Sequence, residues 1–249
     1  MPSFLKDISK FYGTGEKNSA GQTLEEFLEE YDPYKYKTPC CTTDAVIFSF
    51  DGERCENEEE LKVLLVRRSN HPSIGCLALP GGFINLEENL EDTARRELEE
   101  ETGVKGLVME QLAVYGDYDR DPRARVVTTA YLSLVHQKDV RVQAGDDAAD
   151  AMWYGMELKE LSREAVKTEG GAEGEIRLYS LTLRDEEQGF ETSACVKYAW
   201  TGSPLVREEK FTVVRQGETA SDHAAIIVQG LMRVKERLQK AAFSEGLDA

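Results

Sequence analysis

Segments that would bind nucleic acid or a membrane are missing from this chain. No dense block of lysine and arginine occurs, and 47 acidic side chains against 30 basic ones give a formal net charge of −17. Electrostatics therefore argue against nucleic acid or an anionic membrane as the main partner. No stretch approaches the roughly 18 apolar residues of a membrane helix, and the amino terminus lacks the apolar run of a signal peptide. We expect no membrane partner and a cytoplasmic location.

Cysteines are few, and their spacing excludes two further classes of protein. The five cysteines are odd in number, and no two of them have the spacing of a zinc site or of a redox pair. Reduced thiols in a cytosolic protein are the expected state. These residues are Cys40, Cys41, Cys55, Cys76 and Cys195.

What the chain does contain is enough for a substantial core. It has 249 residues, of which 41% are hydrophobic and 31% charged. A capping box at Thr23-Leu24-Glu25-Glu26 predicts a short amphipathic helix that ends at Asp32-Pro33. We predict four segments: an N-terminal arm with this helix (1–33), a main domain (34–163), a β-rich insert (164–217) and a C-terminal helix that packs on the main domain (218–249).

Apolar patterns predict strands that alternate with helices. Two runs, Ala45 to Phe48 and Val63 to Arg68, are expected to be adjacent strands. A short helix is expected at Leu158 to Arg163 and a longer one at Ser221 to about Lys240. This alternation predicts an α/β or α+β sandwich, with the sheet between helical layers. Further strands are expected at Val108 to Gly116, Arg125 to Val135, Ala151 to Tyr154, Ile176 to Leu183, Ala194 to Trp200 and Phe211 to Arg215.

The most informative segment is an acidic helix that runs from about Asn89 to Glu101 and ends at Gly103. At about 100° per residue, Glu97 and Glu101 fall on the side that should pack, with Glu100 at its border. A solvated acidic face explains the other charged residues of this helix but not these carboxylates.

Carboxylates this close together repel one another and are costly to desolvate, so they need a compensating cation. Magnesium, or manganese in its place, suits such a set because it prefers hard oxygen ligands and leaves positions for water and phosphate oxygens. Arg96 lies four residues before Glu100 and could instead reach back to Glu88, which would fix the preceding loop against the helix.

From Gly82 to Val104 the sequence resembles the Nudix box at every defined position: glycine, five residues, Glu88, seven residues, then Arg96-Glu97-Leu98-Glu99-Glu100-Glu101-Thr102-Gly103-Val104. The resemblance implies a Nudix-type α/β/α sandwich with a mixed sheet and a hydrolase that cleaves a pyrophosphate with the help of Mg²⁺ or Mn²⁺. It implies that Glu97, Glu100 and Glu101 bind metal, that Gly82 adds a backbone carbonyl, and that Glu88 and Arg96 organise the loop.

The general base is left open by the sequence. Nudix enzymes place it in the box or on a later loop, and Asp146 and Asp147 lie on a loop that resembles the later one. A helix cap or a turn is an equally good explanation for both aspartates. The candidate catalytic residues are therefore Glu88, Arg96, Glu100, Glu101 and Asp147.

The substrate is narrowed by a second resemblance. The stretch Arg120-Asp121-Pro122-Arg123 resembles the ADP-ribose pyrophosphatase-like branch of the family. Arg120, Arg123 and Arg125 would clamp phosphates or ribose, and a tight Asp-Pro turn with solvated arginines is the alternative. Arg68 and Gly82 complete the candidate substrate contacts. His223 beside Asp222 is either a substrate contact or part of a helix start capped by Ser221 or Asp222.

Two alternative functions remain at this point. Some relatives keep the Nudix fold as an ADP-ribose sensor and add a DNA-binding winged helix, but here the box is intact and the tail after Ser221 is a single helix of mixed charge. An enzyme for nucleoside triphosphates or nucleotide sugars is the other. We expect a small-molecule nucleotide substrate, no nucleic-acid partner and a homodimer, since the helix at Thr23 to Tyr31 and the insert both need partners for their apolar faces.

Overall fold

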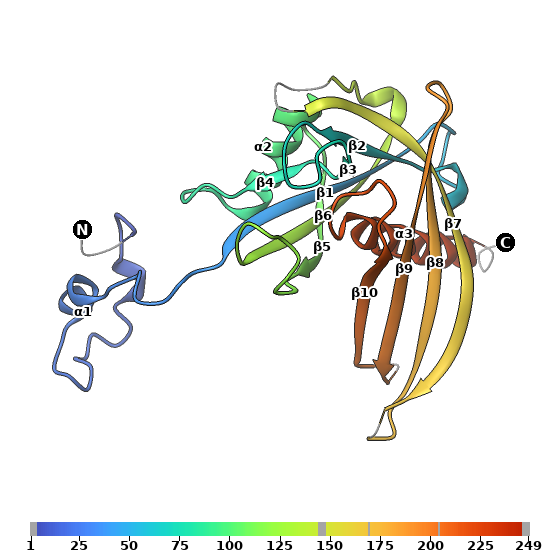
Figure 1. Ribbon diagram of the computed structural model, residues 1–249. Helices are drawn as coiled ribbons and strands as arrows, with labels where there is room; N and C mark the ends of the chain where they lie inside the picture. The colour runs from blue at the N-terminus through green and yellow to red at the C-terminus, as the bar shows by residue number, and fades with distance from the viewer. Residues whose placement is uncertain (1–3, 144–147, 169, 204, 246–249) are drawn as a thin grey trace. The chain divides into compact units, whose positions relative to one another are not determined.

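The computed structural model describes residues 4–143, 148–168, 170–203 and 205–245 (Figure 1). The chain divides into two compact units, Met1–Pro39 and Cys40–Ala249. Among the residues described, no helix combines the length and the apolar character needed to cross a membrane.

The first unit contains a 3-10 helix, η1 (Ser9–Phe11), and helix α1 (Leu24–Glu30). The predicted capping box is confirmed: the backbone N–H of Glu26 donates to Oγ1 of Thr23, and the backbone N–H of Thr23 donates to the Glu26 carboxylate at 2.8 Å. These bonds satisfy two backbone groups that a helix start leaves unpaired. No residue of α1 is buried, and the ring of Phe27 is exposed.

The second unit is built on a ten-stranded sheet, and the expected mixture of parallel and antiparallel strands is confirmed. The main path runs β10-β9-β8-β7-β2-β1-β6-β5, while β3 pairs with β2 and β4 pairs with β1. β1 and β6 are parallel, and the other pairs are antiparallel. The strands are β1 (Cys40–Phe50), β2 (Lys62–Arg68), β3 (Leu77–Ala78), β4 (Gly81–Phe83), β5 (Glu110–Tyr115), β6 (Val126–His136), β7 (Ala148–Lys167), β8 (Glu173–Asp185), β9 (Phe190–Gly202) and β10 (Arg207–Arg215).

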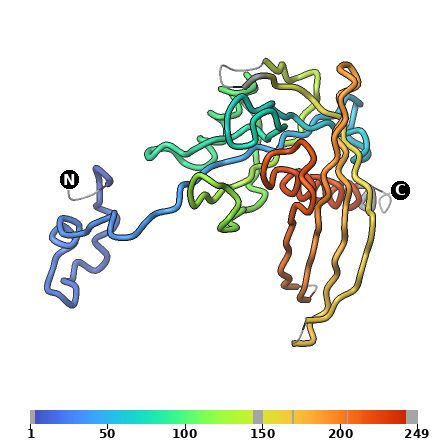
Figure 2. The backbone as a smooth tube through the Cα atoms, in the orientation of Figure 1, coloured from blue at the N-terminus to red at the C-terminus, as the bar shows by residue number. Residues whose placement is uncertain are grey.

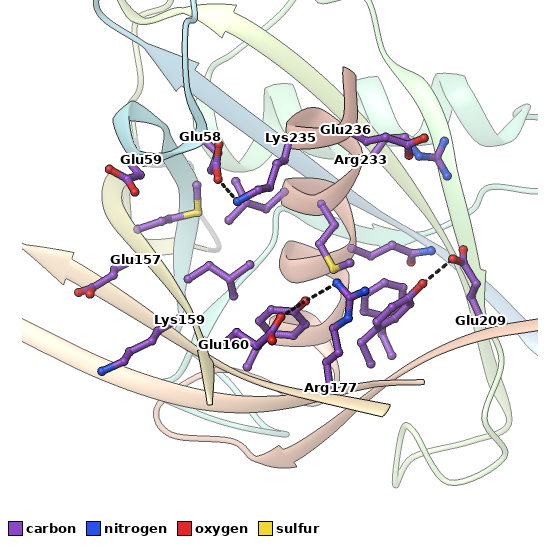
Figure 3. Close-up of a pocket in the computed structure, with 18 of the residues that line it drawn as sticks. Glu58, Glu59, Glu157, Lys159, Glu160, Arg177, Glu209, Arg233, Lys235 and Glu236 are labelled. Atoms are coloured by element: carbon purple, nitrogen blue, oxygen red, sulfur yellow. Dashed lines mark hydrogen bonds and ion pairs between the residues drawn. The ribbon is translucent and has the colours of Figure 1, made fainter. Parts of the chain in front are cut away.

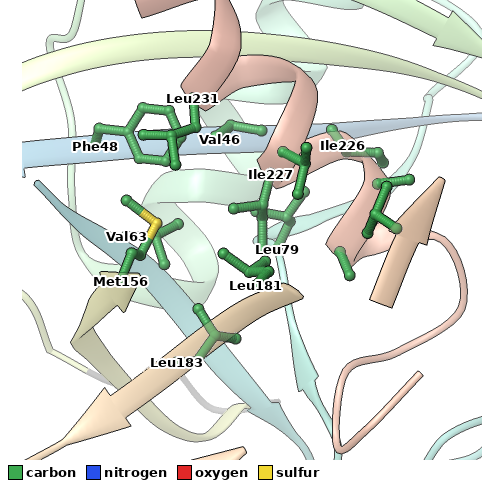
Figure 4. Close-up of a cluster of buried hydrophobic side chains, with 14 of the residues drawn as sticks. Val46, Phe48, Val63, Leu79, Met156, Leu181, Leu183, Ile226, Ile227 and Leu231 are labelled. Carbon is green, nitrogen blue, oxygen red and sulfur yellow. The ribbon is translucent and has the colours of Figure 1, made fainter. Parts of the chain in front are cut away.

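Alternate residues of β1 face two different helices, which makes the predicted sandwich. Ala45 and Ile47 join one buried cluster with Leu98 of helix α2 (Leu90–Thr102). Val46 and Phe48 join the larger cluster, which contains the apolar face of helix α3 (His223–Glu245) (Figure 4). Because strand side chains alternate between faces, one strand holds both helices in place. Short 3-10 helices, η2 (Glu58–Glu60) and η3 (Gln137–Asp139), complete the unit.

The predicted helix at Leu158 to Arg163 is wrong, because these residues belong to β7. β7 pairs with β2 at one end and with β8 from Gly155 to Lys167, and β8 to β10 continue as antiparallel hairpins (Figure 2). Residues with good helical propensity are thus held extended by a long ladder on the neighbouring strand. A bulge between Glu160 and Ser162 interrupts the alternation that would have marked the strand in the sequence.

One strand crosses an expected segment boundary. β7 crosses the expected boundary between the main domain (34–163) and the insert (164–217), so no element ends there. The chain divides after Pro39, and everything from Cys40 onwards is one unit. The four-segment division therefore stays a prediction.

Candidate functional site

The box residues lie where the sequence predicts, on a short strand and the helix that follows it. α2 ends at Gly103, which adopts the left-handed conformation at φ 70° and donates its N–H to the carbonyl of Glu99. A glycine has no Cβ to penalise this conformation, so it ends the helix cleanly. The loop between β4 and α2 carries Glu88, and the two glycines of β4 face the carboxylates of α2.

Arg96 pairs with three carboxylates of the box. Its Nε and Nη2 donate to the two oxygens of Glu88 at 2.8 and 3.0 Å, which confirms the predicted contact across the loop. Its Nη1 donates to Glu97 at 2.7 Å and to Glu100 at 2.9 Å, and Nη2 also reaches the carbonyl of Phe83. The Arg96 bonds, with those from Asn85 and Thr93, lower the pKa of Glu88 to about 2. Arg96 thus holds loop and helix together while it balances three carboxylates.

Two of the box glutamates approach the glycines of β4. A Cβ at Gly82 would lie 2.5 Å from the carboxyl carbon of Glu97, so only glycine permits this approach. Glu101 accepts the backbone N–H of Gly81 at 3.0 Å. Burial raises the pKa of Glu97, and it raises the pKa of Glu101 to about 7 despite that hydrogen bond. Burial thus makes the charged form of both carboxylates less favourable.

Glu101, together with both glycines of β4, borders a cavity of about 420 Å³. Its wall includes Gly82 and Glu101 from the box and Asp44 from β1. Asp44 reaches this position because the first half of β1 pairs with β4, with Asp44 opposite Gly81, before the second half pairs with β2. Sequence reasoning missed Asp44. The only signal was a charged residue at the head of an apolar run, where it reads as a strand end.

A largely buried polar network around Arg120 forms another part of the cavity wall. Arg120 donates two hydrogen bonds of 2.8 Å to Asp222, just before α3, and its side chain is only 7% exposed. Ser221 donates to the carbonyl of Arg120 at 2.6 Å. The side chains of Ser221 and Asp222 thus contact Arg120, while the backbone carbonyl of Asp222 accepts the N–H groups of Ala225 and Ile226 at the start of α3. His223 is buried and lines the same cavity.

The other candidate arginines divide into two groups. Arg123 lines the cavity with 46% of its side chain exposed, pairs with Asp121 at 2.8 Å and lies 5.4 Å from the ring centroid of Phe83. Arg68 also lines it and donates to the carbonyl of Pro72. Arg125 is not among the residues of the wall: it donates to the carbonyls of Gly116 and Asp117, where it braces the loop before β6.

The predicted metal ligands lie on one helix but stand apart as the side chains are placed. Among the side chains that the structure describes, no group of three or more histidines, cysteines or acids is close enough together to hold a metal ion. Arg96 bridges Glu97 and Glu100, and Glu101 is turned to Gly81. The donor chemistry nevertheless suits a divalent cation, since these are hard carboxylate oxygens whose burial disfavours uncompensated charge. The candidate bases Asp146 and Asp147 lie outside the described residues.

A larger cavity of about 1040 Å³ lies between strands β7 to β10 and α3 (Figure 3). Its charged side chains mostly pair with one another: Arg163 pairs with Glu160, and Lys235 with Glu58. Tyr198 donates to Glu209 at 2.7 Å, and burial raises its pKa. None of its lining residues belongs to the box. The smaller cavity is therefore the better candidate for the site, because there the buried carboxylates, the arginines and the close glycines converge.

Comparisons with known proteins agree with this choice. A model of the NUDIX domain matches residues 42–172, which is about half of the chain. Over 121 residues the chain is 40% identical to the ADPR responsive transcriptional repressor NtrR of Acinetobacter baylyi, a match that covers 48% of this chain and 46% of that protein. Over 133 residues it is 35% identical to an ADP-ribose pyrophosphatase of Methanocaldococcus jannaschii, a match that covers 52% of this chain and 72% of that protein. The chain thus spans less than half the length of the repressor.

The structural likeness extends further than the sequence match. A crystal structure of a MutT/nudix family protein from Enterococcus faecalis superposes with a TM-score of 0.57 at 31% identity, over 86% of this chain and 70% of that one. Such coverage cannot be confined to residues 42–172, so part of β8 to α3 has a counterpart there. With the box geometry, the mixed sheet between two helices and the match of the family model, the chain belongs to the Nudix family.

Proposed function

We propose that the chain is a metal-dependent pyrophosphohydrolase that cleaves ADP-ribose to AMP and ribose 5-phosphate. The observation that carries the proposal is the arrangement of the box, in which the partly buried Glu97 and Glu101 approach β4, and Glu101 lines one cavity together with several arginines. Carboxylates alone would repel a pyrophosphate, and arginines alone would bind it without activating water. Their combination around one cavity supports hydrolysis of a phosphoanhydride.

The residues divide the work by their chemistry. Glu97, Glu100 and Glu101 would hold Mg²⁺ or Mn²⁺, with the backbone carbonyl of Gly82 as a further ligand. The bound cation would neutralise phosphate charge and lower the pKa of a water molecule. Arg96 and Glu88 keep the loop in register with the helix through their paired hydrogen bonds. Arg123 and Arg68 are placed on the wall to orient the phosphates, which removes much of the entropic cost of reaction.

ADP-ribose is the preferred substrate class for two reasons. The relative at 35% identity is named an ADP-ribose pyrophosphatase, and the name of the relative at 40% identity calls it ADPR responsive. The Arg120-Asp121-Pro122-Arg123 segment that resembles this branch of the family also contributes to the wall of the cavity. Phe83, which is 44% exposed and lies beside Arg123, offers a ring face on which a base would stack.

A regulatory role is the second candidate, because one relative is a transcriptional repressor. Its support here is limited to the shared domain. The helix after the hairpins, α3, has Ile226 and Ile227 fully buried in the core, so that face is unavailable to enter a DNA groove. The absence of a nucleic-acid partner nevertheless stays a prediction.

The test is a comparison of kcat/KM for ADP-ribose, ATP and a UDP-sugar with Mg²⁺ or Mn²⁺ present and after chelation. We expect ADP-ribose to be preferred and chelation to abolish turnover. Glu100→Gln keeps the side-chain shape but removes a ligand charge, so it should lower kcat by roughly a hundredfold or more. Because Glu100 is half-exposed, the unfolding midpoint should barely change. Full activity in excess chelator, or a Glu100→Gln variant at the wild-type rate, contradicts the proposal.

A further inference from the structure

Four polar side chains from distant parts of the chain meet at the inner wall of the cavity. Asp44 comes from β1, Thr128 from β6, Arg120 from the loop before β6, and His223 from the first position of α3. Thr128 is fully buried, and the side chains of Asp44, Arg120 and His223 are 10%, 7% and 10% exposed. The last three line the cavity, so their small exposed surface faces its interior.

The hydrogen bonds around His223 fix which of its ring nitrogens carries the proton. Nδ1 lies 2.8 Å from the backbone nitrogen of Leu79, which has only a proton to donate, so Nδ1 must be the acceptor. The neutral ring then carries its proton on Nε2. Nε2–H is therefore a donor, and Nε2 lies 3.9 Å from Oδ1 of Asp44, too far for a direct hydrogen bond.

Asp44 has one oxygen satisfied and the other open. Oδ2 accepts the hydroxyl proton of Thr128 at 2.7 Å and lies 3.7 Å from Nη2 of Arg120, while Oδ1 accepts no hydrogen bond from any part of the chain that the structure describes. A carboxylate oxygen without a donor and an N–H without an acceptor thus stand side by side at the cavity, where a group that both donates and accepts satisfies both.

We propose that Asp44 and His223 bind a sugar hydroxyl of the substrate, which accepts from Nε2–H and donates to Oδ1. This proposal rests on the proposed function and adds the part of the substrate that the inner wall recognises. Because Nε2 and Oδ1 are 3.9 Å apart, a hydroxyl group placed beside the line that joins them can hydrogen-bond to both atoms. A phosphate oxygen would accept from His223 but meet the charge of Asp44, so the phosphates belong nearer the box and the more exposed arginines. Arg120 is held by Asp222 and balances Asp44 from the other side.

Two substitutions of His223 separate its two nitrogens. His223→Asn places an amide oxygen near the position of Nδ1, so it keeps an acceptor for Leu79 and removes the donor toward Asp44. His223→Gln extends an amide group to the position of Nε2, so it keeps the donor and removes the acceptor for Leu79. The first variant should fold like the wild type, and the second should be less stable because a buried backbone N–H loses its partner.

The measurement is kcat/KM for ADP-ribose and for analogues that each lack one sugar hydroxyl. The wild type should discriminate against one analogue by at least about tenfold. His223→Asn should bring that ratio close to one, whereas His223→Gln should keep most of it. Equal loss on all substrates, or discrimination that survives in His223→Asn, overturns the proposal while ADP-ribose hydrolysis stands.

The ring can also be examined without turnover. Nitrogen-15 NMR of the wild type, with His223→Asn to assign the signal, should show Nδ1 unprotonated and Nε2 protonated at neutral pH. A protonated Nδ1 overturns the proposal whatever the activity. If the expected tautomer is found and no nucleotide is hydrolysed, the proposed function fails.

Discussion

At the scale of single residues, Arg123 is the side chain on which the substrate assignment can be tested most directly. It is 46% exposed, pairs with Asp121 and lies over Phe83 at the cavity wall. Arg123→Ala removes a bidentate donor without opening the core. If the donor binds substrate in both the ground and transition states, KM for ADP-ribose should rise roughly tenfold; if it acts only in the transition state, kcat should fall instead.

The matched control is Arg125→Ala, because Arg125 lies outside the cavity wall and its side chain donates to the backbone carbonyls of Gly116, Asp117 and Val126. It should affect stability more than KM. An Arg123→Ala variant that matches the wild type on ADP-ribose would leave the family assignment standing and remove the substrate assignment.

The box contacts could be predicted from sequence because they are local. The Arg96 to Glu88 pair spans eight residues, and the positions of Glu97 and Glu101 follow from helical geometry. The inner wall could not be predicted, since Asp44 and His223 are far apart in the chain and meet only when α3 packs on β1. The sequence shows that His223 follows Asp222 but not that the side chain of Asp222 binds Arg120.

At the scale of elements, β8 shows how the long hairpins and α3 share one core. Leu181 is fully buried in the same cluster as Ile226 and Ile227 (Figure 4). Leu181→Ala should lower the free energy of unfolding by about 2–5 kcal/mol, because it leaves a cavity between sheet and helix. Urea denaturation followed by circular dichroism gives the change.

Leu161→Ala is the control for that measurement. Leu161 lies in the adjacent strand β7, at the bulge, and is 48% exposed. Its truncation should change the free energy of unfolding by less than about 0.5 kcal/mol. Equal losses in the two variants would contradict the packing of β8 against α3.

The strands of this region show what periodicity predicts and where it fails. Alternating burial in β8 and β9 matches the alternation of apolar residues such as Leu181, Leu183 and Val196, so both strands were predictable. The outer half of β7 was not, because Leu158-Lys159-Glu160-Leu161 has helical spacing and the bulge removes the two-residue repeat. Pairing with β8 over a long ladder decides the conformation there, and pairing is not a local property.

At the scale of the whole molecule, the sequence predicts a homodimer, and the exposed side chains of α1 give that prediction a test. Phe27 and Tyr31 pack on each other at 5.7 Å between ring centroids and are 43% and 57% exposed, while no residue of α1 is buried. An amphipathic helix whose aromatic side chains face water gains free energy when a second surface covers them. Light scattering at micromolar concentration should give about twice the monomer mass of 27.9 kDa.

Replacing both Phe27 and Tyr31 with serine should shift the population toward monomer, whereas Val108→Ser, at a residue that is 91% exposed, should leave it unchanged. A wild-type protein that is strictly monomeric would contradict the prediction, and a dimer that persists in the double variant would move the interface away from α1.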